Sequence, residues 1–182
     1  PVSYRFRFWD DTGAALNAPI ANGANGDIAG VLQPGAAVFA QTAGTSAALT
    51  QGWAEVASSG RIGVTGVLRF SAAGLSDQLA SVSGVQSGSN VLLPFDDGQG
   101  AVTGVAIANS NATQPVTVSM TFTLDNNTQS SATLTLPAHG HTAFVLPTSY
   151  AATAGARGGI RFLSAGADVS VAGDRKSTRL HS

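Results

Sequence analysis

The sequence predicts an all-β protein folded as an antiparallel β-sandwich, and three observations support this fold class. Apolar residues alternate with Thr and Ser over 116–124 and again over 132–136, which is the period of a strand with one buried face. Residues that favour turns interrupt the chain at short intervals, as is typical of sandwiches with short strands. No segment has a convincing 3.6-residue apolar period, so long helices are not expected.

The composition excludes several classes of function. The chain has 182 residues, 43% hydrophobic and only 10% charged, with a net charge of −1. We expect no nucleic-acid partner without a basic stripe, and no membrane insertion without an apolar run of about 20 residues. Cysteine is absent, which excludes disulfides and thiol catalysis. The chain begins at Pro1 with neither Met nor a signal peptide, so we expect a fragment or a processed product.

The first half is expected to begin with a half-buried strand, because aromatic residues alternate with arginines over 4–8. A turn at 10–13 ends it. Further short strands are expected at 31–33, 37–41, 52–56 and 62–70, separated by loops at 14–30 and 44–51. Residues 71–90 are rich in Ser, Gly and Ala and are the expected linker. Leu79 and Val82 mark a short strand or a single helical turn within it.

The second half is predicted from the same signals. Strands are expected at 91–95 and 104–108, at the two alternating segments, in a segment ending at Phe144, and at 159–162 and 169–171. A loop is expected at 147–158, with a brief helical turn over 148–152.

An internal repeat is the strongest organisational signal. Three pairs of segments resemble each other: Tyr4–Asp11 and Val118–Asp125, Leu32–Phe39 and Leu136–Phe144, and, without a gap, Gly52–Gly66 and Gly159–Gly173. The repeat predicts a truncated first module at 1–73, a linker at 74–90 and a related second module at 91–173, with generic β alternation as the alternative. The first module lacks its first two strands, so we expect an unpaired edge near Tyr4–Trp9.

The segments LLPFDD, TGVAIAN, VTVSMTF, LTLPAHGHTAFVL, GGIRF and VSVAG, in this order, resemble a recurrent module of large secreted or surface proteins of environmental bacteria, notably Acidobacteria. The resemblance covers nearly all of residues 2–173. It implies an extracellular, immunoglobulin-like sandwich with no established activity. The family continues after Gly173 with Gly-Leu-Arg-Phe. Here the tail 174–182 resembles sequencing-adapter read-through in a metagenomic assembly, so it is expected to lie outside the fold.

Paired carboxylates and histidines are the candidate metal ligands. Asp96 and Asp97, like Asp10 and Asp11, precede a turn containing glycine, and paired carboxylates are weak candidates for Ca²⁺, which needs six to eight oxygens. His139-Gly140-His141 offers two ligands without a third. Ordinary turn chemistry accounts better for both patterns, so we expect no metal and no cofactor.

Trp9 and Trp53 are the candidate binding residues. Aromatic side chains at these positions form either a platform for sugar or protein, or part of the core. Tyr4 and Phe8 share the apolar face of an alternating strand, whereas Trp9 breaks the alternation and is the better surface candidate. Core or edge packing is the preferred interpretation.

Catalytic signatures are missing from the sequence. Glu55 is the only glutamate, and no Gly-x-Ser-x-Gly segment marks a nucleophile. We expect no enzyme, but a secreted or cell-surface structural spacer or protein-interaction module. Its expected partners are other domains of the parent protein or surface proteins. The alternative is a carbohydrate-binding module that uses exposed aromatic residues to hold polysaccharide.

Overall fold

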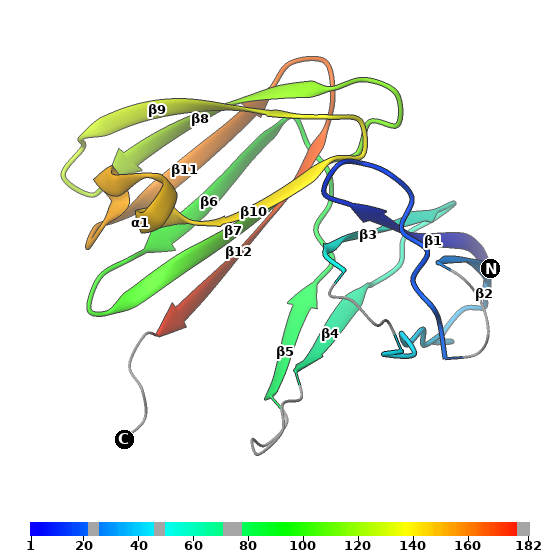
Figure 1. The fold of residues 1–182 in the computed structure, drawn as a ribbon. Coiled ribbons are helices and arrows are strands. Elements are labelled where there is room, and N and C mark those ends of the chain that lie inside the picture. The colour runs from blue at the N-terminus through cyan, green and yellow to red at the C-terminus, as the bar shows by residue number, and fades with distance from the viewer. Residues whose placement is uncertain (22–25, 46–49, 71–77, 178–182) are drawn as a thin grey trace.

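A computed structural model describes residues 1–21, 26–45, 50–70 and 78–177 (Figure 1). Nearly all of its regular structure is antiparallel β, with one turn of α-helix and one of 3₁₀-helix. The predicted all-β sandwich is therefore confirmed. We call the strands up to Ser83 the first half of the chain and the strands from Asn90 onward the second half.

The second half is a two-layer sandwich (Figure 1). One sheet has the order β6 (Asn90–Asp96), β11 (Arg157–Ser164), β8 (Val116–Leu124) and β9 (Gln129–Leu136). The other has the order β10 (His141–Val145), β7 (Ala101–Asn109) and β12 (Val169–Ser177). The helical turns α1 (Leu146–Ser149) and η1 (Ala151–Thr153) connect β10 to β11.

The core lies between these two sheets, as the alternation predicts. Every second side chain of β8, from Val116 to Phe122, is buried, while the Thr and Ser residues between them face outward. Phe122 pairs with Ile160 of β11 in register, and both pack toward the facing sheet, where Val105 and Ile107 are buried. Apolar burial of this kind is the main stabilising term of the fold.

The first half contains a three-stranded sheet and a separate two-stranded ribbon. In the sheet, β1 (Val2–Asp10) lies between β2 (Asp27–Leu32) and β3 (Gly52–Ser58). The ribbon pairs β4 (Thr65–Phe70) with β5 (Gln78–Ser83). The first half has little hydrophobic core: among the described residues before β6, Ile20 is the only large apolar residue that is buried.

The expected unpaired edge near Tyr4–Trp9 is wrong. Tyr4 lies opposite Gly30 on one side and Ser58 on the other. Both segments that follow β1 return antiparallel to it and occupy both of its edges. The open edges of this sheet therefore belong to β2 and β3.

The strand expected at 37–41 does not form. The segment ends instead in an isolated bridge between Ile20 and Thr42. In the second half, β10 follows β9 and is held by β7, whereas no strand of the described part of the first half lies beside 37–41. Strand propensity without a partner to hydrogen-bond does not give a strand.

The expected linker and tail both contribute structure. Within 74–90, β5 is the short strand marked by Leu79 and Val82, and Gly88 bridges to Val169 of β12. The preceding residues 71–77 lie outside the described ranges. Residues 174–177 extend β12 along 101–104 of β7, so their expected exclusion from the fold is wrong, because β7 offers them an unpaired edge. Residues 178–182 lie outside the described ranges.

The two halves share one strand arrangement. The order β2-β1-β3 matches β9-β8-β11, with the earliest strand in the centre each time. The register also agrees, because Val2 lies opposite Leu32 where the repeat alignment places Val116 opposite Leu136.

The third pair of repeat segments is shifted by one residue. The ungapped alignment places Trp53 on Ile160, which faces the core. In the structure Trp53 lies opposite Trp9, on the other face of the sheet from Phe8, and Ala54 takes the position on the face of Phe8. A shift of one residue moves side chains to the other face, so the duplication stays a prediction.

Truncating Phe162 to alanine is expected to destabilise the second half strongly. Phe162 is fully buried, and Phe→Ala changes in a core cost about 3–5 kcal/mol. Chemical denaturation measures the loss. Leu92→Ala on the exposed face of β6 is the matched control and should cost less than about 0.5 kcal/mol. Equal losses in the two variants would contradict this placement of the core.

Candidate functional site

The two candidate tryptophans meet at the junction of the two halves. Trp9 is the penultimate residue of β1 and lies directly opposite Trp53 of β3. The imidazole of His139, in the turn before β10, stacks on Trp9 with ring centroids 3.8 Å apart and planes 8° from parallel. The Trp53 indole Nε1 donates a hydrogen bond to the carbonyl oxygen of His139 at 2.8 Å. Both tryptophans are half-buried, and one face of the Trp9 ring is occupied.

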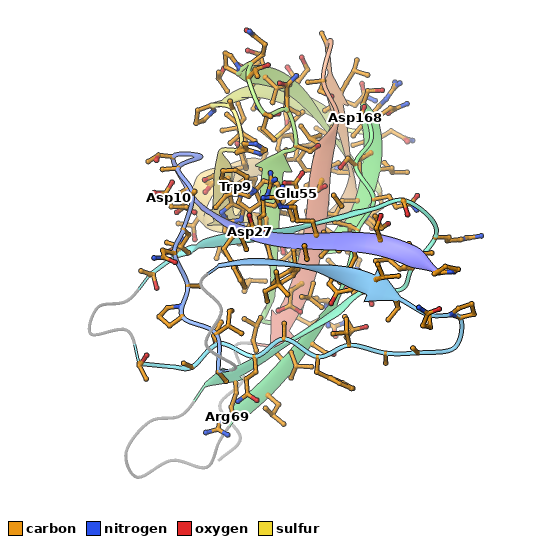
Figure 2. The ribbon with its side chains drawn as sticks, turned by 90° about the vertical axis from the view of Figure 1, so that its right-hand side faces the viewer. Trp9, Asp10, Asp27, Glu55, Arg69 and Asp168 are labelled. Atoms are coloured by element: carbon orange, nitrogen blue, oxygen red, sulfur yellow. The ribbon has the colours of Figure 1, made fainter. Side chains whose placement is uncertain are left out.

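Hydrogen bonds fix the orientation of this cluster. The Trp9 indole Nε1 donates to Oε2 of Glu55 at 3.2 Å, and Figure 2 shows these two side chains together beside β1. Nearby, Nδ1 of His141 lies 2.8 Å from Oδ1 of Asp11. The backbone N–H of His141 also donates to the carbonyl oxygen of Asp11 at 3.2 Å. The only glutamate and both histidines of the Pro137–His141 turn therefore contribute to one junction.

Close backbone approach completes the junction. Gly13 has a φ of +87°, and a Cβ at this position would lie 1.9 Å from the carbonyl oxygen of Ala138. Only glycine fits there, for steric and for conformational reasons. The Asp10 carboxylate accepts hydrogen bonds from Thr12 and from the N–H of Ala14, which hold the turn and keep the pKa of Asp10 below its usual value.

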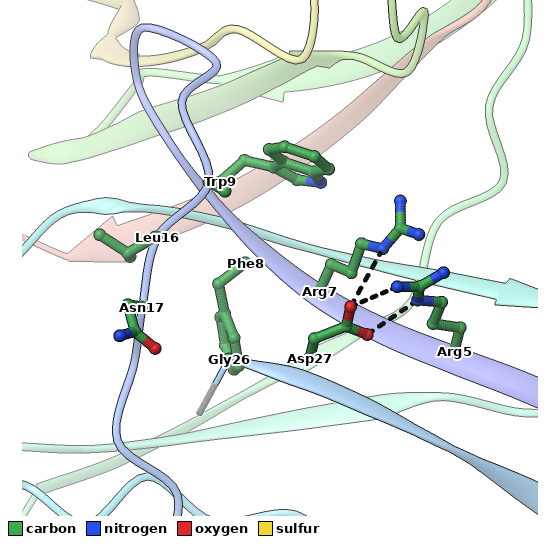
Figure 3. A pocket seen from close by; sticks show the side chains of 9 residues that line it. Arg5, Arg7, Phe8, Trp9, Leu16, Asn17, Gly26 and Asp27 are labelled. Carbon is green, nitrogen blue, oxygen red and sulfur yellow. Dashed lines mark hydrogen bonds and ion pairs between the residues drawn. The ribbon is translucent and has the colours of Figure 1, made fainter. Parts of the chain in front are cut away.

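A hollow of about 380 Å³ lies beside this junction, on the first half (Figure 3). Arg5, Arg7, Trp9 and Asp27 contribute to its lining, together with Phe8 and the loop residues Ala15, Leu16, Asn17 and Gly26. Arg5 binds both carboxylate oxygens of Asp27, and Nε of Arg7 lies 3.8 Å from Oδ2. Hydrogen bonding to Arg5 lowers the pKa of Asp27 and raises that of Arg5.

The weak metal candidates Asp96 and Asp97 have different surroundings. Asp96 accepts hydrogen bonds from the N–H of Gly98 and from Nε of Arg157 at 3.1 Å, and Arg175 lies 3.1 Å from its other oxygen. Asp97 is buried, and its Oδ1 accepts a hydrogen bond from the N–H of Thr103, while its Oδ2 is buried without a hydrogen-bond partner. Two arginines at Asp96 compete with any cation for its carboxylate.

No three His, Asp or Glu side chains gather into a metal-sized cluster within the described ranges. The two histidines that the sequence singles out make separate contacts. The His139 ring stacks on Trp9, and the His141 ring contacts the carboxylate of Asp11.

Sequence reasoning brought together Trp9 and Trp53 as candidates but did not find their partners. His139 lies 86 residues from Trp53, and Asp11 lies 130 residues from His141. The one available signal was the concentration of special residues in PAHGH, where two histidines flank a glycine.

Comparisons with protein-family models, curated proteins and solved structures gave no match. Across the described part of the chain, every helix is too short to cross a lipid bilayer.

The Asp96 cluster is expected to make the fold sensitive to acid. The N–H of Gly98, then Arg157 and Arg175, lower the pKa of Asp96. A depressed folded-state pKa gives stability that is fully present above the usual aspartate pKa of about 3.9. This stability is lost as the pH falls through the lower folded-state value.

We therefore expect Asp96→Asn to be less stable than the unchanged chain at neutral pH and to lose less stability on acidification between about pH 5 and pH 2. Denaturation midpoints measured across this range give the comparison. Asp125→Asn, in the exposed turn after β8, is the control and should follow the unchanged chain. An Asp96→Asn curve parallel to that of the unchanged chain would count against this role.

Proposed function

We propose that this chain is a non-catalytic structural module of a larger secreted or surface protein of bacteria, which holds neighbouring domains or surface proteins at a fixed spacing. The junction between the halves carries the proposal. A spacer must resist bending at its joints, and this joint combines a ring stack, an indole hydrogen bond and an Asp–His contact in one turn.

The junction restrains the halves in more than one direction. The Trp9–His139 stack opposes separation of the ring planes, while the paired contacts of Asp11 with the side chain and backbone of His141 oppose sliding. The backbone of Gly13 lies so close to the carbonyl oxygen of Ala138 that no side chain would fit at position 13, so the two halves are in tight contact there. Several weak contacts that must break together give more rigidity than any one of them alone.

The use of the acidic side chains also supports a non-catalytic role. Asp10 holds a turn, Asp11 contacts His141, Asp27 binds Arg5, Glu55 accepts from Trp9, and Asp96 lies between two arginines. General acid–base catalysis needs a carboxyl group or imidazole within reach of a substrate proton. These groups are instead engaged with their own chain.

The outer face of the second half supports the proposed extracellular role, which the resemblance to bacterial surface modules also implies. Thr117 and Thr135 lie across from each other on β8 and β9 with their hydroxyls 3.1 Å apart. A face of hydroxyl groups stays hydrated without a large net charge.

Rigidity of the junction can be measured with spin labels, because the chain has no cysteine of its own. Labels at Ala29→Cys on β2 and Ser131→Cys on β9, both exposed, span the two halves. We expect one narrow distance distribution by double electron–electron resonance. Adding Trp9→Ala and Asp11→Ala should broaden it, since the Trp9–His139 stack and the Asp11–His141 side-chain contact are then removed, leaving the backbone bond of His141 and the Trp53 hydrogen bond across the junction.

Labels at Ser131 and Ala165, both on the second half, are the control and should keep their distribution in the same background. A broad distribution in the chain with an intact junction would contradict the spacer proposal.

Carbohydrate binding is the second candidate, and the hollow beside Trp9 is the observation that favours it. An indole next to the Arg5–Asp27 pair offers a stacking surface together with hydrogen-bonding groups, which is the usual composition of a sugar site. Because His139 already covers one face of Trp9, a sugar ring would have to use the other face or the edge.

A glycan array and affinity electrophoresis on polysaccharides separate the two candidates. The spacer proposal expects no retention by any glycan. Retention that Trp9→Ala reduces at least about tenfold, corresponding to 1.4 kcal/mol, would favour the carbohydrate module instead. Phe39→Ala, at an exposed aromatic residue outside the hollow, is the matched control.

A further inference from the structure

The β4–β5 ribbon is the least supported element of the described fold. It forms a sheet of its own, drawn at the lower centre of Figure 1, with Leu68 opposite Ala80 and Arg69 opposite Leu79. A two-stranded sheet in water is marginal unless a third strand or a covering layer is added. The other described sheets have three or four strands.

The ribbon exposes apolar side chains on both faces. The register puts Val67 and Leu79 on one face, where they are 67% and 69% exposed. Leu68 and Val82 lie on the other face and are 64% and 43% exposed. Most exposed large apolar residues of surfaces are scattered singly, whereas these four are concentrated on two short strands.

The free edge of β5 carries no feature that blocks strand pairing. Natural edge strands are commonly protected by charge, proline or a bulge, and Gln78–Ser83 contains neither a charged residue nor a proline. The edge strand β9 is also uncharged, but the outer face beside it carries Ser and Thr, so pairing there would bury little apolar surface.

We propose that β5 is a self-association edge, at which two copies of this chain pair antiparallel across a two-fold axis to form a four-stranded sheet β4-β5-β5′-β4′. The proposal deepens the structural role proposed above and rests on it. It supplies the third strand that the ribbon lacks and covers parts of Leu79 and Val82 next to the edge.

Charge does not oppose a second copy in this arrangement. Arg69 is the only charged residue of β4 and β5. In the proposed sheet the two arginines lie on the outer strands, about 14 Å apart at about 4.8 Å per strand spacing. That separation exceeds the Debye length of about 8 Å at physiological salt, so like-charge repulsion is screened. Pairing through β4 would bring the two arginines onto adjacent strands.

The apolar area that pairing would bury sets the expected affinity of the dimer. Fully burying one large apolar side chain yields about 1.5–3 kcal/mol at about 25 cal/mol per Å², or about 60–120 Å² each. Pairing at the β5 edge covers only Leu79 and Val82, which give at most about 240 Å² per copy, well below the roughly 800 Å² of a standard stable interface. The dimer is therefore weak and forms only at high protein concentration.

Sedimentation velocity of the full chain, from low micromolar to near-millimolar concentration, tests the proposal. We expect a reversible shift from monomer to dimer. Leu79→Lys places a charge beside the pairing edge and should raise the dissociation constant at least about tenfold. Leu79 is exposed but lies opposite Arg69 of β4, so hydrogen exchange of the β4 and β5 amides verifies that the ribbon still forms in the variant. Thr133→Lys, which places the same charge on β9, is the matched control and should leave dimerisation unchanged.

A spin label at Ser81→Cys on β5 should report a short distance between copies, whereas a label at Ser131→Cys on β9 should not. A monomer at all concentrations, a dimer that Leu79→Lys leaves intact, or one that Thr133→Lys abolishes would overturn the proposal. Failure here is distinguishable from failure of the spacer role. A monomer with a narrow distance distribution across its junction refutes only the pairing of β5.

Discussion

Burial of the alternating face of β8 against its neighbours is the interaction on which the rest of this structure depends. Met120 and Phe122 pair with Phe162 and Ile160 of β11, and the facing sheet closes over them. This packing places β9 and β10 so that the turn between them, Pro137–Gly140, projects toward the first half. The junction that orients Trp9 and Trp53 is thus built on a turn whose position the core of the second half determines.

The junction shows how a small number of polar side chains is used when charged residues are scarce. His139 contributes its ring face to Trp9 and its carbonyl oxygen to Trp53, and its positive φ of 51° presents both at once. A non-glycine residue in this region is uncommon and costs free energy, which the surrounding contacts must offset. Both the spacer role and the alternative sugar site depend on these groups.

The sequence predicted the fold where the signal was local. Alternation over 116–124 revealed a strand and its buried face, because a period of two residues is visible within a few positions. Strand order was harder to predict. The edges of β1 pair with residues 20–30 positions away in β2 and 42–54 positions away in β3, and local propensity does not encode such pairings. The failure of 37–41 to form a strand has the same origin. Trp9 and Trp53 were found as aromatic candidates, but His139 and Asp11 were not linked to them, since their contacts cross from one half to the other.

The uneven distribution of buried apolar side chains implies that the two halves need not melt together. In the described part of the chain before β6, only Ile20 among the large apolar residues is fully shielded, whereas the sandwich has a continuous interior. Subglobal opening follows such differences, and weakly packed segments exchange their amide hydrogens before the remainder. Much of the stability of the first half then comes from its contacts with the Pro137–His141 turn. The first half is therefore an N-terminal unit that unfolds before the sandwich, and a single two-state transition would describe the unfolding of the chain poorly.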